Sequence, residues 1–248
     1  MATVKSTSRA DKARQTRRRL LGAARNRFIE RGYAAATMEQ IASDAGVAVQ
    51  TVYYTFGTKG RLLTEVVDLT AAGTDEGVPP MQRAWAQEML ATHSAQRALA
   101  LAVEHGTAIY DRVAHLWPSV NAAAAMDADV ATYWRAVNTG RRNGQAALVA
   151  RLRELDSLRQ DLSDSKAADL LVFLAGHAPY IGLVVDAGWS SKEYRVWLFE
   201  TLKRQLLASQ RRDAQATADL SFSSPDTDEQ APPIHEDRGR NEGGRPSR

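Results

Sequence analysis

Cysteine is absent from the 248 residues of this chain, which excludes disulfides, thiolate metal ligands and a cysteine nucleophile. Long apolar runs are also expected to be absent, because none approaches the roughly 18 residues that span a bilayer. The N-terminus is polar and basic and lacks the apolar core of a secretory signal. These absences favour a cytoplasmic protein that does not enter a membrane.

Catalytic and metal-binding motifs form a second group of absences. The sequence has no Walker loop, no HExxH and no GxSxG, and the spacing of its 5 histidines suits no set of metal ligands. Residues 163–166 match S-x-x-K, but the companion motifs of β-lactamases are missing and a helix cap explains the serine. We therefore expect no catalytic residues, no metal site, no cofactor and no enzymatic activity.

Charge is distributed unevenly along the chain. Residues 1–70 contain 12 Lys and Arg against 6 Asp and Glu, whereas residues 71–248 contain 20 against 23. A basic N-terminal part followed by a slightly acidic remainder is typical of a DNA-contacting domain joined to a domain that does not contact DNA.

Residues 37–59 carry the most informative pattern in the sequence. Thr37, with Gln40 three residues later, has the spacing of a capping box and predicts the start of a helix. Gly46 supplies the positive φ of a tight turn, and a second short helix is expected to end at Phe56. Two short helices joined by a glycine turn indicate a helix-turn-helix, whose second helix enters the major groove of DNA.

The second of these helices has two different faces when its residues are placed at about 100° each. Val52 and Phe56 point together toward the first helix, whereas Gln50 and Tyr54 lie on the opposite side. An amide can bond a base edge at two points, and hydroxyl groups reach phosphate oxygens without repulsion. An ordinary wet surface is the alternative, but two adjacent exposed tyrosines favour contact with DNA.

Residues 17–67 resemble the DNA-binding domain of the TetR family of transcriptional repressors. The matching features are the basic opening, Phe28, Gly32, Tyr33, Thr37, Ile41, Ala42, Ala45, Gly46, Val47, Thr51, Val52, Tyr53, Tyr54, Phe56 and Lys59. The resemblance implies an all-helical homodimer whose C-terminal domain binds a small molecule that releases the protein from its operator. It also implies that Lys59, at a helix N-terminus, lies on a phosphate.

Together these arguments give a set of expected DNA contacts. Gln50 and the methyl groups of Val49 are predicted to read bases, and the hydroxyl groups and the lysine to bind phosphates. The predicted DNA-binding residues are Thr37, Val49, Gln50, Thr51, Tyr53, Tyr54 and Lys59.

The predicted fold is all-α and has four parts. Residues 1–11 are expected to be a disordered arm, residues 12–71 the helix-turn-helix domain, residues 81–211 a helical-bundle domain for ligand binding and dimerisation, and residues 212–248 a disordered tail. The segment AAGTDEGVPP at residues 71–80 is the expected joint between the two domains.

The second domain is expected to be helical throughout. Its predicted helices cover residues 81–93, 95–116, 129–155, 163–187 and 190–210, with a short alanine-rich piece at 120–126. Trp117 and Pro118 should end the second of these helices, because the residue before a proline avoids the α region. Pro179 should kink the fourth, because it removes a helical hydrogen bond.

Aromatic residues with polar groups are spread over these helices. Each is most simply explained as core, but together they suit a mostly apolar pocket with a few orienting groups. His177 is the most informative because it lies in an apolar helix beside the predicted kink; a histidine bonded to a carbonyl would look the same. The candidate ligand-binding residues are Trp85, Tyr110, Trp117, Tyr133, Trp134, His177 and Tyr180.

The last two predicted helices are strongly apolar, and residues 170–185 are apolar on almost every side. They could form the interior of a monomer, but the resemblance implies that they pair with their symmetry mates, and two half-sites add affinity for DNA. The expected dimer-interface residues are Leu170, Phe173, Ile181, Trp197, Leu198, Thr201 and Leu202.

The function predicted from these features is a sequence-specific transcriptional regulator, a repressor released by a small apolar or amphipathic ligand. Its expected partners are double-stranded operator DNA, a small-molecule effector and a second copy of the chain. A ligand-independent helix-turn-helix regulator is one alternative, and a helical enzyme or scaffold with a basic head is another. Steeply salt-dependent, sequence-selective binding to DNA would separate the first two from the third.

Overall fold

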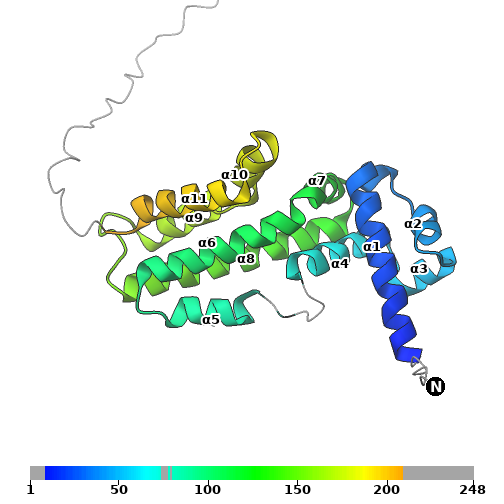
Figure 1. The fold of residues 1–248 in the computed structure, drawn as a ribbon, viewed down its shortest axis with the longest axis horizontal. Helices are drawn as coiled ribbons and strands as arrows, with labels where there is room; N and C mark the ends of the chain where they lie inside the picture. The colour runs from blue at the N-terminus through cyan, green and yellow to red at the C-terminus, as the bar shows by residue number, and fades with distance from the viewer. Residues whose placement is uncertain (1–8, 74–77, 79, 209–248) are drawn as a thin grey trace, which may run out of the picture. The chain divides into compact units, whose positions relative to one another are not determined.

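The computed structural model describes residues 9–73, 78 and 80–208, and every element named within these ranges is a helix (Figure 1). In chain order the elements are α1 (Arg9–Ala35), α2 (Met38–Asp44), α3 (Val49–Phe56), α4 (Lys59–Ala72), η1 (Pro80–Gln82), α5 (Ala84–Ala91), α6 (Ala95–Val113), η2 (Ala114–Leu116), α7 (Trp117–Met126), α8 (Ala128–Glu154), α9 (Asp164–Leu174), α10 (His177–Tyr180), η3 (Ile181–Asp186) and α11 (Ser191–Leu206). The predicted all-α class is confirmed. The division into domains at residues 71–80 stays a prediction, because residues 74–77 and 79 lie outside the described ranges.

Local signals in the sequence set the ends of the first four helices. Helix α1 begins at Arg9, earlier than predicted, so that residues 9–11 are helical; the rest of the expected arm lies outside the described residues. Its backbone leaves the helical region at Gly32 (φ 74°), a conformation that glycine adopts readily. Helix α4 begins after Thr58, whose side chain accepts a hydrogen bond from the backbone N–H of Arg61, and it ends at the left-handed Gly73.

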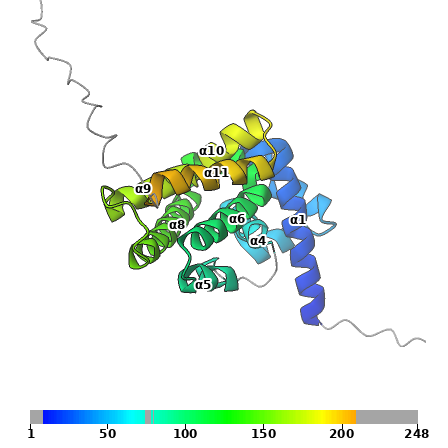
Figure 2. The same cartoon turned by 60° about the vertical axis from the view of Figure 1, so that its left-hand side comes forward.

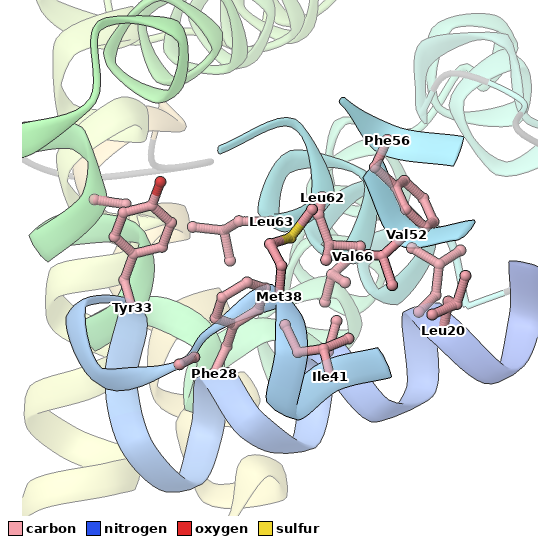
Figure 3. Packing of buried hydrophobic residues seen from close by; sticks show 14 of the residues in the cluster. Leu20, Phe28, Tyr33, Met38, Ile41, Val52, Phe56, Leu62, Leu63 and Val66 are labelled. Atoms are coloured by element: carbon pink, nitrogen blue, oxygen red, sulfur yellow. The ribbon is translucent and has the colours of Figure 1, made fainter. Parts of the chain in front are cut away.

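An apolar core holds these four helices together (Figure 3). Phe28 of α1, Ile41 of α2 and Phe56 of α3 are fully buried in it. The same cluster continues through Val120 of α7 and Val130 of α8. Because this core is shared, a displacement of α7 would be felt directly by α1.

A second core joins the remaining helices. In Figures 1 and 2, α6 and α8 lie side by side, and α11 and α9 cover them. Leu99, Leu152 and Tyr194 are fully buried at the centre of this cluster. Apolar residues of α6, α8 and α11 are thus buried together in one cluster.

Two prolines begin helices, contrary to the predictions made for them. Pro118 lies in the first turn of α7, whereas we expected it to end a helix running to residue 116; α6 ends at Val113. Similarly, the helix predicted over 163–187 breaks at Gly176, and Pro179 lies in the first turn of α10. The reason is the same at both positions: the first turn of a helix has no intrahelical acceptor for its N–H groups, so a proline loses nothing there.

Two further helices are shorter than predicted. Residues 81–93 contain only η1 and α5, because the chain turns extended at Thr92. Helix α11 ends at Leu206, and the next residue, Leu207, forms an isolated antiparallel bridge with Leu158. The predicted tail at 212–248 lies outside the described residues.

Candidate functional site

The turn between α2 and α3 is built as the sequence indicates. The hydroxyl of Thr37 accepts from the backbone N–H of Gln40, and the Gln40 amide oxygen accepts from the backbone N–H of Thr37, each at 3.2 Å. Gly46 adopts φ 63° in the turn. Val52 and Phe56 of α3 are buried against α1 and α2, which fixes the rotation of α3 about its own axis.

With those two residues buried, the opposite face of α3 meets solvent. Tyr54 is 93% exposed, and Tyr53 and Gln50 are also exposed. Thr51 is partly exposed, whereas Val49 packs partly against the core, so that less of its side chain is free than the sequence suggests. The structure therefore places an amide and phenol groups together on one outward face. Such a face can hydrogen-bond the edges of bases and the oxygens of phosphates.

Lys59 lies in a different environment from the one expected. Its ammonium donates to the backbone carbonyls of Tyr33, at 2.8 Å, and Ala36, at 3.1 Å, and it lies 4.4 Å from the centre of the Tyr33 ring. Lys59 thus satisfies carbonyl groups at the end of α1, where a cation is favoured. One of its three N–H groups is left for a phosphate.

Several side chains join the helix-turn-helix to the helices that follow. The Tyr33 hydroxyl donates to the Asp127 carboxylate at 2.7 Å, and the Ser119 hydroxyl donates to the carbonyl of Phe28 at 2.5 Å. Arg112 of α6 donates to the carbonyls of Thr70 and Ala71 at the end of α4. These contacts are long-range in sequence, and no local pattern predicts them.

Three of the predicted ligand-binding residues form an aromatic cluster between α7, α8 and α10. The ring of Trp117 lies 3.9 Å from that of His177 and 4.5 Å from that of Trp134, measured between ring centres. Burial, followed by the charge of Arg141, lowers the pKa of His177 below its ordinary value. The histidine is therefore neutral at pH 7, and it sits among aromatic rings.

Tyr110 and Tyr180 lie together beside this cluster, with ring centres 5.6 Å apart. The Tyr180 hydroxyl donates to Asp111 at 2.5 Å, and the Tyr110 hydroxyl donates to the carbonyl of Ala175 at 3.3 Å. Arg141 of α8 donates to the Tyr110 hydroxyl at 3.0 Å. No local pattern predicts this contact, because it depends on how α6 and α8 pack.

The remaining two ligand candidates lie elsewhere. Trp85 stacks on His105 with ring centres 4.8 Å apart, and both line a cavity of about 370 Å³ between α4, α5 and α6. The Tyr133 hydroxyl donates to Asp68 of α4 at 2.6 Å. The seven aromatic residues therefore do not line a single pocket.

The residues predicted for the dimer interface divide into two groups. Leu198 and Leu202 are fully buried within the single chain, so the expectation that they face a partner is wrong: their side of α11 packs on α6. Phe173 is 67% exposed, and Leu170, Ile181, Trp197 and Thr201 are partly exposed. Val185 and Val196, which the prediction did not include, add exposed apolar side chains.

The same region corrects the statement that no apolar run has the length of a membrane span. By length and composition alone, Asp164–Asp186 qualifies, with a mean hydropathy of 1.7 and only 22% of its most apolar window buried. Its backbone is not one continuous helix, because α9 ends at Leu174 and α10 begins at His177. Phe173 and Val185 of this segment are exposed, and Leu170, Ile181 and Val184 are only partly buried against the core, so part of its apolar surface is left uncovered by the described chain.

The comparisons with known proteins agree with the geometry of the N-terminal helices. Residues 20–66 match the model of the family described as bacterial regulatory proteins, tetR family. No curated protein matches the chain. Many solved structures match the chain. The three described below are less than 25% identical to it, and at that identity they show the fold alone.

Three of these structures illustrate the likeness. A transcriptional regulator from Saccharomonospora viridis in complex with choline is 19% identical, with a TM-score of 0.62, and the match covers 79% of this chain and 100% of that one. NalD, the secondary repressor of the MexAB-OprM multidrug efflux pump in Pseudomonas aeruginosa, is 19% identical with a TM-score of 0.62, and the match covers 81% of this chain and 100% of that one. SmeT is the repressor of a Stenotrophomonas maltophilia multidrug efflux pump. Its complex with triclosan is 18% identical with a TM-score of 0.61, and the match covers 79% of this chain and 93% of that one.

Proposed function

We propose that this chain, a TetR-family regulator by its helix-turn-helix at residues 20–66, is a homodimeric repressor that a small apolar or amphipathic molecule releases from its operator. The observation that carries the proposal is the outward face of α3, where Gln50 and Tyr54 are exposed while Val52 and Phe56 anchor the helix. An exposed face of this composition, held rigidly by a buried one, suits insertion into a major groove.

Within this proposal the predicted contacts take two roles. Gln50 reads a base edge with its amide, and Val49 adds a smaller apolar contact through the part of its side chain that is exposed. Thr37, Thr51, Tyr53, Tyr54 and Lys59 bind phosphates, Lys59 through its remaining N–H.

Dimerisation is supported by the uncovered apolar surface of α9, α10 and η3. Phe173 and Val185 lie on this surface, together with partly exposed Leu170 and Ile181. A second copy of the chain would bury it and would present two reading helices to two half-sites about one turn of DNA apart. The proposed location in the cytoplasm is consistent with DNA as the partner.

Ligand control is supported by the position of the aromatic cluster. Trp117 is the first residue of α7, and Val120 and Ala123 of the same helix lie in the core shared with α1. A molecule that inserts beside Trp117 would displace α7 and thereby change the position of the reading helices. It would release DNA to the extent that it binds the displaced state more tightly. The ligands of the similar structures, choline and triclosan, differ in chemistry, so the likeness does not identify an effector.

The experiment that tests the proposal begins with selection of bound sequences from random double-stranded DNA. We expect a palindromic sequence to be enriched, and its affinity to fall steeply with salt, whereas a scrambled duplex of the same composition binds weakly. A panel of small apolar and amphipathic molecules is then screened for release of the selected duplex, followed by fluorescence anisotropy. Absence of any enriched sequence refutes DNA regulation and favours the enzyme or scaffold alternative. Enrichment without release by any molecule favours the ligand-independent regulator.

A further inference from the structure

Arg141 of α8 is a partly buried cation whose Nε is enclosed by the protein and has no hydrogen-bond partner. One terminal nitrogen, Nη1, donates to the Tyr110 hydroxyl. Within the part of the chain that the structure describes, no carboxylate lies within ion-pair distance of its guanidinium. Enclosing a charged donor without an acceptor is costly, so an Nε of this kind needs a reason that the fold alone does not supply.

Neighbouring arginines on the same helix behave differently. Arg142 forms an ion pair with Asp169 at 2.7 Å, and Arg153 forms one with Asp164 at 2.7 Å. Arg151 pairs with Glu154 and also donates to the carbonyl of Thr92. Arg135 of α8 also lacks a carboxylate partner among the described residues, but its side chain is exposed and donates to the Thr132 hydroxyl. Arg141 differs from it because its Nε is buried without a partner.

One further polar group without a partner and a pair of aromatic rings lie on the elements that pack around Arg141. Thr107, one turn before Tyr110 on α6, is 1% exposed, and its hydroxyl has no hydrogen-bond partner. Gly176 lets the backbone pass close to the guanidinium, since a Cβ at that position would lie 3.1 Å from Nη1 and 2.7 Å from the carbonyl oxygen of Val172. The ring of His177, the next residue, contacts that of Trp117 at 3.9 Å between ring centres, tilted by 34°.

We propose that Arg141 binds the anionic group of the effector, and that the effector is therefore an organic acid with a flat apolar or aromatic body. The Nε and Nη2 edge of a guanidinium matches a carboxylate with two parallel hydrogen bonds, and no described protein group accepts a hydrogen bond from that edge of Arg141. The body of the acid lies against Trp117 and His177. This inference rests on the proposed function, because it names the chemical class of the molecule that releases DNA.

The rings of Trp117 and His177 are in contact, so the acid has to separate them in order to bind. Trp117 begins α7, and Ser119 of the same turn donates to the carbonyl of Phe28 on α1. Separation of the rings therefore displaces the part of α7 that touches the helix-turn-helix. The site that binds the anionic group is thus also the site that couples ligand binding to DNA binding.

The test compares two acids with their uncharged alcohols: 2-naphthoate with 2-naphthalenemethanol, and decanoate with decanol. Affinities are measured by calorimetry on the wild type, on Arg141→Met, which keeps an unbranched chain without charge, and on Arg142→Met. The last is a matched control because Arg142 is the next residue but its side chain is 58% exposed. We expect the wild type to bind at least one acid about 10-fold or more tighter than its alcohol, and Arg141→Met to lose that acid's affinity by roughly 10- to 100-fold. Arg142→Met should match the wild type.

A second measurement does not need a ligand. Removing a cation whose Nε is buried without a partner should leave the melting temperature of the ligand-free protein unchanged or raise it by a few degrees. A structural role for Arg141 predicts the opposite. A lower melting temperature with an unchanged preference for acids overturns the proposal, and so does a wild type that binds neither acid or binds acids and alcohols equally.

Release of the selected operator duplex separates this inference from the function on which it rests. If an acid binds through Arg141 and leaves DNA affinity unchanged, the anion site stands and ligand control of DNA binding fails. If the alcohols release DNA equally from the wild type and from Arg141→Met, ligand control stands and the anion site is refuted.

Discussion

Tyr33 joins the helix-turn-helix to α8 through a single hydroxyl, so Tyr33→Phe tests how firmly the two are connected. The hydroxyl donates to Oδ2 of Asp127 at 2.7 Å. The ring is buried and stacks on Phe28 with ring centres 6.0 Å apart. The substitution therefore removes one hydrogen bond and leaves the packing of the ring in place.

The size of the effect follows from what Asp127 retains. A hydrogen bond to a charged group contributes about 1.5–3 kcal/mol. Asp127 is not left without partners, because its Oδ1 accepts from the backbone N–H groups of Asp129, at 3.0 Å, and Val130, at 3.3 Å. Its carboxylate is also partly exposed, so that water can replace the hydroxyl. We expect the free energy of unfolding to fall by about 1–2 kcal/mol at pH 7.

The pH dependence of this loss has a definite sign. The Tyr33 hydroxyl is the largest influence on the pKa of Asp127 and lowers it. A carboxyl group with a lowered folded-state pKa stabilises the fold above its unfolded pKa of about 3.9, and this stability is lost as the pH falls through the folded value. The difference between Tyr33→Phe and the wild type should therefore be constant from about pH 8 to pH 5 and shrink below about pH 4.

Urea unfolding at a fixed protein concentration measures these quantities, since a dimer's apparent stability depends on concentration. Tyr54→Phe is the matched control, because it removes the same atom from a side chain that is 93% exposed. It should leave the free energy of unfolding unchanged. A loss below about 0.5 kcal/mol for Tyr33→Phe, or a loss that grows in acid, would refute the reasoning.

Three other substitutions test the reading helix, the dimer and the aromatic cluster. Gln50→Ala should lose about 1–3 kcal/mol of discrimination at one or two base pairs of each half-site in competition binding; an unchanged preference means that Gln50 does not face the bases. Phe173→Glu should fold but sediment as a monomer, because its side chain is 67% exposed in the single chain, whereas Met126→Glu, 69% exposed on α7, should stay dimeric. Burial, followed by the charge of Arg141, lowers the pKa of His177. The neutral ring therefore stabilises the folded state above about pH 6.5, and this stability is lost as the pH falls through the folded-state pKa. His177→Phe should therefore show a flatter decline of unfolding free energy from pH 7 to pH 5, and wild-type pH dependence in that variant would contradict this account.

How well the sequence predicts the structure depends on how far apart along the chain the interacting residues lie. The capping box of Thr37 and Gln40 and the turn at Gly46 both form as their spacing predicts. Each joins residues within one turn of chain, so the sequence contains the whole interaction. The exposed face of α3 was also predictable, because burying Val52 and Phe56 determines where the opposite residues point.

Prolines and apolar stripes were less informative, because one pattern allows two structures. Pro118 and Pro179 each suit the end of one helix or the first turn of the next. The structure places both of them in a first turn. The stripe that contains Leu198 and Leu202 suits either a dimer interface or the interior of a monomer. The structure places both leucines in the interior because α11 packs on α6.

By itself, therefore, the sequence determined the helix boundaries near its capping residues, the helix-turn-helix and the outward face of the reading helix. Tertiary structure decided the rest: that Lys59 bonds the carbonyls at the end of α1, that Trp117 meets His177, and that Arg141 bonds Tyr110 while its Nε is buried without a partner. The physical reason is that a capping residue interacts with its own turn, whereas the partner of a buried side chain depends on the rotation and offset of two packed helices. Those quantities are set by the whole core and not by any short stretch of sequence.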